Sequence, residues 1–240
     1  MARSLTPGYF RSSLKRTLKQ TSIAAVIVAV VGNYFTYQER IDTRQQNAWS
    51  VLRSALEWSE AKKWGNVGQI QAIETLTRDC DAWWLDTPLK YLLGRDCANL
   101  KSLSLMTMDF GGMNAPGATL SYGYFACSNF SAAHLARAHL DHTAFMAARL
   151  ADADFSGADL TTSCLFLADV SGARFDSGTK IDSKDLLKAC VMLDQHGARR
   201  SIDAASNTAI GQIADQIPLC PADPNRCGLL SSRHGWTCGD

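Results

Sequence analysis

Apolar residues recur at every fifth position from Leu100 to Phe175, sixteen times without interruption. The segment 96–175 contains 17 Leu and Phe residues, and 14 of them fall in this one register. A small residue, most often alanine, lies two positions before most of them. A helix repeats every 3.6 residues and a strand every two, so a period of five requires a chain that turns a corner in every repeat. The pattern therefore predicts that each repeat directs one small and one large side chain inward.

The repeats also share a sequence motif. The segments CANLK, AHLDH, ADFSG, ADLTT and ARFDS follow the pattern A-(D/N)-L-X-X. Over about 96–176 the chain resembles the bacterial pentapeptide repeat proteins. This resemblance implies an all-β solenoid, a right-handed quadrilateral β-helix with four repeats per coil, and hence about four coils.

The resemblance also implies four inward columns, formed by residues twenty positions apart. The structural core would consist of Leu100, Leu105, Phe110, Leu120, Phe125, Phe130, Leu135, Leu140, Phe145, Leu150, Phe155, Leu160, Leu165 and Phe175, with Val170 and the smaller Ala115. These side chains fill the interior and leave no space for a ligand. Pro116 lacks a backbone N–H, so we expect a bulged corner within 111–117.

The N-terminal region has the pattern of a membrane anchor. Residues 1–20 form a basic tail without acidic residues, and an unbroken apolar run follows at 23–32. We interpret 21–38 as a single transmembrane helix with the basic tail in the cytoplasm. Two alternatives remain open, namely a cleaved signal peptide and a buried helix of a soluble protein.

Helical segments are expected on both sides of the repeats. In 39–95, which we interpret as a helical stalk and N-terminal cap, Trp49, Leu52 and Leu56 form one helical stripe. Ile70, Ile73 and Leu76 mark a second, shorter helix that would cover the open edge of the first coil. Trp83 and Trp84 would pack in this cap or form an aromatic recognition patch. In the C-terminal cap and tail, 177–240, we expect a helix from Asp182–Ser183 to Gln195, a short helix near 201–215, and an irregular tail.

Eight cysteines are present, and none forms a CxxC pair that would indicate a zinc site. An exported domain would use them as disulfides. Cys127 and Cys164 fall in different coils and are not expected to pair with each other. The other six allow several connectivities, of which we favour Cys80–Cys97, Cys190–Cys220 and Cys227–Cys238. Free thiols are the alternative.

The outward residues offer little chemistry. The chain has a net charge of +1, so no global field indicates nucleic acid. His134, Asp154 and Arg174 should stack as one surface ladder, with shorter ladders at His139–Asp159 and at Asn129, Arg149 and Asp169. Such ladders stabilise a surface or form a recognition stripe. His134, His139 and His142 suggest a metal site, but adjacent faces direct them apart. No nucleophile, metal-hydrolase or phosphate-loop motif is present.

These observations predict a protein that is not an enzyme and has no catalytic residue, metal, cofactor, nucleic-acid partner or small-molecule substrate. The leading hypothesis is a membrane-anchored scaffold in the bacterial inner membrane, with its β-helix in the periplasm and an unidentified protein partner. An accessory subunit of a membrane complex is an alternative. The family also contains DNA mimics that bind topoisomerases, but those rods are strongly acidic and this one is not. An enzymatic activity in the C-terminal tail is the remaining alternative.

Overall fold

The structure, a computed structural model, describes residues 25, 28, 31, 32, 35, 39, 40, 42–54, 68–78, 80, 97–204, 206–221 and 227. The chain divides into two compact units, Met1–Arg44 and Gln45–Asp240, which we treat separately.

In the first unit, every described residue is helical. Val28 and Phe35, which lie in the predicted anchor, expose 70% and 62% of their surface. Within the described part of the chain, no helix is both long and apolar enough to cross a membrane. Most of 21–38 lies outside the described residues, so the anchor stays a prediction.

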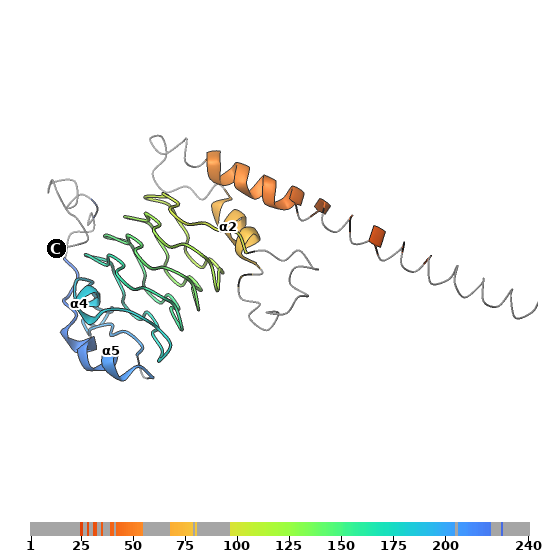
Figure 1. The fold of residues 1–240 in the computed structure, drawn as a ribbon. Helices are drawn as coiled ribbons and strands as arrows, with labels where there is room; N and C mark the ends of the chain where they lie inside the picture. Colours follow the sequence, from red (N-terminus) through yellow and green to blue (C-terminus); the bar gives the residue numbers. More distant parts are fainter. Residues whose placement is uncertain are drawn as a thin grey trace, which may run out of the picture. The chain divides into compact units, whose positions relative to one another are not determined.

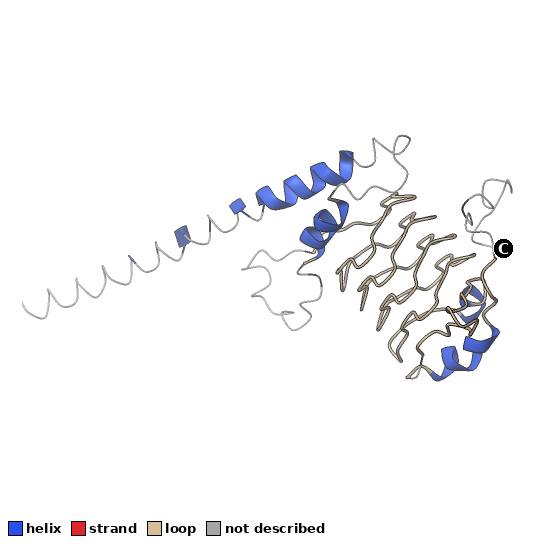
Figure 2. Ribbon diagram, turned by 180° about the vertical axis from the view of Figure 1, so that it is seen from behind, coloured by secondary structure: helices blue, strands red, loops and turns tan. Residues whose placement is uncertain are grey.

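The second unit contains the solenoid, which is built from parallel bridges between residues twenty positions apart (Figure 1). The bridges form four columns, which begin at Asn99, Ser104, Asp109 and Asn114. Each contact is a single bridge, so the described coils are drawn as loops in Figure 2. The backbone N–H groups of the inward residues bond to the next coil, as from Leu140 to the Asp159 carbonyl at 2.8 Å. The predicted solenoid of stacked coils is confirmed.

Each repeat turns a corner with one residue in the left-handed region. Fifteen such residues, one in every repeat from Ser102 to Gly172, have φ between +53° and +68°, and only four are glycine. At a typical corner, the Ala138 N–H donates to the Leu135 carbonyl at 3.1 Å and closes the turn. This is the geometry of a type II turn, whose third residue requires a positive φ. The corners explain why a period of five is compatible with β-bridges.

The predicted core residues all point inward and are buried. None of the fourteen exposes more than 2% of its surface. Phe110 packs on Phe130 with its ring tilted and the centroids 4.8 Å apart, and Phe125 stacks on Phe145 at 5.7 Å. The interior of the described coils is therefore filled by stacked side chains.

The expected bulge at Pro116 is absent. Ala115 donates to the His134 carbonyl at 2.9 Å and Gly117 to the Ala136 carbonyl at 2.8 Å, as in the other coils. At the equivalent position of other repeats, the N–H bonds only to a side chain, as from Ser131 to Asn129 Oδ1 at 3.1 Å. Proline at this position removes a backbone N–H that the coil-to-coil hydrogen bonds do not use. Proline is also favoured at the second residue of a type II turn.

Two helices lie at the N-terminal end of this unit. Helix α2, Gln69–Thr77, buries Ile73 and Leu76 in the same core as the solenoid, as its apolar spacing predicted. It begins after Gly68, and the Leu76 carbonyl accepts the Ala98 N–H at 3.1 Å. Residues 45–54 are also helical, and Leu52 is fully buried in this core. Leu56, Trp83 and Trp84 lie outside the described residues.

The predicted helix from Asp182 to Gln195 is wrong. Only α4, Ser183–Leu186, is helical, and the chain then returns to the solenoid. Lys180 pairs with Asp159, Cys190 with Asp169, and Asp203 with Arg174, which adds an irregular fifth coil. The bridges and buried Val191 hold this segment extended, so tertiary contacts prevail over its helical pattern.

The short helix expected near 201–215 is present. Helix α5, Thr208–Ile213, begins at Asn207, whose side chain accepts the Ile210 N–H, and it continues as η2, Ala214–Gln216. Ile210 and Ile217 are buried against the end of the core.

Candidate interaction surface

One polar column follows the solenoid over all of its coils. The outward residues Asn114, His134, Asp154, Arg174 and Asp203 form consecutive bridges, and we call them the polar ladder. It contains the predicted ladder of His134, Asp154 and Arg174 and extends it by one residue at each end. The extension to Asp203 could not be predicted, because the fifth coil breaks the period of twenty.

Basic and acidic side chains alternate along the polar ladder from His134 to Asp203. His134 Nδ1 lies 3.8 Å from Asp154 Oδ2, and Arg174 Nε lies 4.0 Å from Asp203 Oδ2. The side chains of His134, Arg174 and Asp203 are 58% to 64% exposed. Exposed pairs at such distances contribute little to stability, about 0–1 kcal/mol each. Their polar atoms remain available to a partner.

The column that begins at Asn99 ends in a closer ion pair. His139 pairs with Asp159, as predicted, and Asp159 pairs with Lys180. Lys180 Nζ lies 3.2 Å from Asp159 Oδ2. Burial opposes ionisation of Asp159, but hydrogen bonds from Thr161 and the contact with Lys180 outweigh it and lower the pKa of this carboxyl group.

The third predicted ladder is also present, but it is less exposed. Asn129, Arg149 and Asp169 form consecutive bridges, and Asp169 retains only 7% of its surface. Asp169 Oδ1 accepts the backbone N–H of Ser171 at 3.1 Å and its hydroxyl at 2.6 Å. This ladder mainly organises its own turns.

An aromatic pair at one corner was not foreseen. The rings of Tyr122 and His142 stack with centroids 4.6 Å apart. Asp141 accepts the Ser121 hydroxyl at 2.5 Å, and its other oxygen lies 3.4 Å from His142 Nδ1. Burial raises the pKa of Asp141, but these two hydrogen bonds prevail and lower it. The spacing of twenty between Tyr122 and His142 was the available signal.

His134, His139 and His142 do not lie together at one site. His134 and His139 lie in different columns, and His142 lies at the corner after His139. In the part of the chain that the structure describes, no group of three or more His, Cys, Asp or Glu side chains could hold a metal ion.

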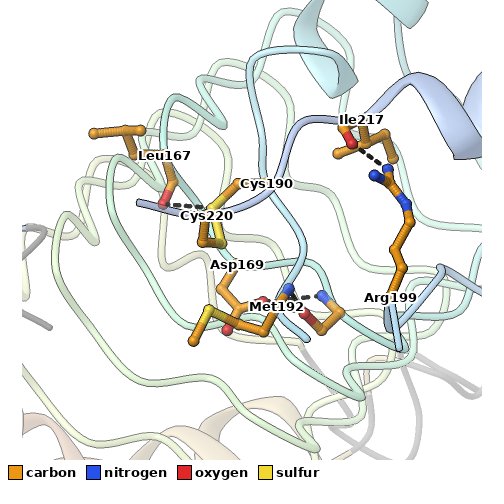
Figure 3. The surroundings of a disulfide bond; sticks show 8 residues. Leu167, Asp169, Cys190, Met192, Arg199, Ile217 and Cys220 are labelled. Carbon is orange, nitrogen blue, oxygen red and sulfur yellow. Dashed lines mark hydrogen bonds between the residues drawn. A yellow bond between two sulfur atoms is a disulfide. The ribbon is translucent and has the colours of Figure 1, made fainter. Parts of the chain in front are cut away.

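Disulfides fasten both ends of the solenoid. Cys80 is bonded to Cys97, with Cα atoms 4.6 Å apart, and Cys190 to Cys220 at 4.7 Å. Both pairs are the ones that the sequence analysis favoured. The second joins the fifth coil to the segment after η2 (Figure 3).

The favoured pair Cys227–Cys238 is wrong. Cys227 is bonded to Cys127, a hundred residues earlier, and Cys164 is disulfide-bonded as well. The error came from leaving Cys127 and Cys164 out of the pairing because they were not expected to bond to each other. Both are outward-facing, but a bond to the C-terminal segment needs no contact between their coils.

An arginine near this end was also missed. Arg199 Nη2 donates to the carbonyl oxygens of Ala214, at 3.1 Å, and of Ile217 (Figure 3). These carbonyls end α5 and η2, where a positive charge is favourable.

Comparison with known proteins identifies the repeats. The family model for pentapeptide repeats matches residues 124–165 with eight copies. This segment therefore consists of pentapeptide repeats, and the bridges continue the same coils from Asn99 to Arg174.

Several solved structures are similar to the chain. A pentapeptide repeat protein from the thylakoid lumen of Arabidopsis thaliana has 17% identity and a TM-score of 0.33; the alignment covers 55% of this chain and 90% of that one. QnrB1, a plasmid-mediated fluoroquinolone resistance protein, has 17% identity and a TM-score of 0.25, over 40% of this chain and 49% of that one. The pentapeptide repeat protein Rfr23 of the cyanobacterium Cyanothece 51142 has 15% identity and a TM-score of 0.19, over 42% and 94%. TM-scores this low do not establish a shared overall fold. None of the curated proteins compared with the chain matches it.

Proposed function

We propose that this protein is a non-enzymatic scaffold that presents a rigid β-helix to a protein partner in the bacterial periplasm. Residues 21–38 would anchor it in the inner membrane, with residues 1–20 in the cytoplasm. In a membrane complex, the same arrangement would make it an accessory subunit.

The filled interior is the observation that carries this proposal. Stacked Phe and Leu side chains occupy the space between the four columns of bridges. A partner must therefore bind to the outer faces or the ends of the coils. The polar ladder supports protein binding because its exposed charges alternate at regular strand spacing and its backbone is fixed by the coils on either side.

The disulfides support a location outside the cytoplasm. The bonds Cys80–Cys97, Cys127–Cys227 and Cys190–Cys220 are of the kind that forms in oxidising compartments. The apolar run at 23–32, preceded by basic residues, also supports a location of the repeats outside the cytoplasm.

Protease treatment of whole cells tests the location. The repeats should resist an added protease in intact cells and become accessible after the outer membrane is opened. A cytoplasmic marker must stay protected in the same sample. Cleavage that requires lysis of the inner membrane would contradict the proposal.

Site-specific cross-linking from the full-length protein in its membrane tests the interaction. A photoreactive residue at Arg174, in the polar ladder, should give one discrete protein adduct. The same residue at Lys180 is the matched control, because Lys180 is equally exposed and ends a different column. Equal adducts from both positions, or none from Arg174, would contradict a partner on the polar ladder.

A further inference from the structure

Five outward-facing apolar residues in the second to fourth coils are buried although they do not belong to the core of the solenoid. Ala126, Cys127, Met146, Ala147 and Cys164 expose between 1% and 7% of their surface, and we call them the covered patch. Three of them, with Tyr124, Ala144 and Phe166 beside them, form a hydrophobic cluster separate from the interior. They lie along one face and the following corner, between the column of Ser104 and the column of Asp109.

Equivalent residues at other corners show that this burial is not a property of the repeat. Ala126 is 1% exposed, whereas Ala136 and Ala151 occupy the same position of their repeats and are partly exposed. Ala147 is 4% exposed, whereas Ala132, again at the same repeat position, is exposed. Met106 begins the same corner in the first coil and is 45% exposed. The cover therefore begins at the second coil.

The position of the disulfides indicates what covers the patch. Cys127 belongs to the patch and is bonded to Cys227, with Cα atoms 5.6 Å apart. Cys164, at the other side of the patch, is disulfide-bonded too. We infer that residues 221–240 lie along the covered patch as a C-terminal strap and that the patch is the docking surface for this segment of the same chain.

The reach of the chain fits this path. Cys220 is bonded to Cys190 in the fifth coil, and Asn129, two residues after Cys127, lies three coils earlier in the same column of bridges. Three coils at strand spacing separate the two points by about 14 Å. Seven residues lead from Cys220 to Cys227, and they span up to about 25 Å when extended. The chain can therefore return along the solenoid without strain.

The composition of the strap also fits the patch. Leu229, Leu230 and Trp236 follow Cys227 and give the strap large apolar side chains. The patch offers Ala, Met and aromatic side chains, and burying both surfaces removes apolar area from water. A free patch of this kind would promote association between copies, so the strap also protects the solenoid.

Hydrogen exchange of the full-length oxidised protein tests this inference. Met146→Lys places a charge in the covered patch, and Met106→Lys places it at the exposed position of the same corner. Ala147→Lys and Ala132→Lys form a second matched pair. Both patch variants should speed exchange in 221–240 by at least about tenfold, and both controls should leave it unchanged. Unchanged exchange at Leu140 in all four variants will show that the coils remain folded.

Three results would overturn the inference. The first is exchange in 221–240 of the unaltered protein as fast as in a free peptide of the same sequence. The second is faster exchange in another segment of the chain, such as 55–67, in the patch variants while exchange in 221–240 is unchanged. That other segment would then be the cover. The third is a Cys127–Cys227 bond that joins two chains, which a non-reducing gel and peptide mapping will detect.

Discussion

At the scale of single residues, the corners of the solenoid determine much of the backbone energy. Eleven residues other than glycine adopt a positive φ, among them Ala132 at +57° and Ala147 at +53°. The left-handed region costs an ordinary residue roughly 1–2 kcal/mol. The coils tolerate this cost because each corner is held by hydrogen bonds to the coils above and below.

Ala132→Gly should therefore stabilise the protein by about 0.5–1 kcal/mol, since glycine relieves the strained φ and the exposed methyl group makes no core contact. Urea unfolding measures the change. Ala133→Gly is the control, because Ala133 is fully buried and its loss should destabilise the protein. Destabilisation by both substitutions would contradict the argument.

The acidic residues at the corners make stability depend on pH. Asp176 accepts the N–H of Gly157 at 2.7 Å and that of Gly178 at 2.9 Å. Burial opposes ionisation of this group, but these bonds prevail and lower its pKa, as happens at Asp141 and Asp159. A carboxyl group with a lowered pKa in the folded state contributes stability above its unfolded pKa of about 3.8.

The contribution of these carboxyl groups to the free energy of unfolding should therefore be constant above about pH 5. It should decrease as the pH falls below about 4. Asp176→Asn should lower the stability at pH 7 and reduce this fall. Denaturant titrations between pH 7 and pH 2.5 measure both quantities. An equally steep fall in the variant would show that Asp176 does not contribute.

At the scale of elements, the last helices depend on one arginine. Arg199 reaches back to the carbonyl oxygens of Ala214 and Ile217, which end α5 and η2. The adjacent Arg200 instead forms an exposed ion pair with Asp152, in which Arg200 Nη2 lies 2.6 Å from Asp152 Oδ1. The sequence gives no reason to distinguish the two arginines, because only the fold brings the helix end to one of them.

Arg199→Met should destabilise the C-terminal cap by about 1.5–3 kcal/mol, because it removes hydrogen bonds from a charged donor while it keeps the apolar stem. Arg200→Met is the matched control and should cost less than about 1 kcal/mol, since exposed ion pairs contribute little. Thermal unfolding with hydrogen exchange in 208–217 measures both effects. Equal losses would refute the assigned role.

At the scale of the whole second unit, each coil is stabilised mainly by its contacts with the neighbouring coils. Each coil contacts only its neighbours, so both ends need protection. Helix α2 and the Cys80–Cys97 bond protect the first coil, and α4, α5 and the Cys190–Cys220 bond protect the last.

Replacing Cys190 and Cys220 together by alanine should lower the free energy of unfolding by about 3 kcal/mol, since the bond closes a loop of 30 residues. Exchange should rise first in 188–221 and remain slow near Leu140. Uniform acceleration along all coils would indicate that the unit unfolds as one block, without a separate C-terminal end.

The sequence determined the solenoid because its period is local. Side-chain direction within one repeat is a property of five residues, so the period alone predicted which residues point inward. That Leu100, Leu120 and Leu140 share one column followed from the resemblance to pentapeptide repeat proteins, which implied four repeats per coil. Pro116 also fits the regular repeat. The bulge expected there was wrong because the coil-to-coil hydrogen bonds do not use the backbone N–H at this position.

The tertiary structure decided what happens where the repeat ends. Residues 188–195 follow the open edge of the fourth coil, although their local pattern favours a helix. Cys127 and Cys227 meet across a hundred residues, and Arg199, not Arg200, meets the end of a helix. Such contacts depend on the folded positions of distant segments, and no short-range pattern in the chain encodes them.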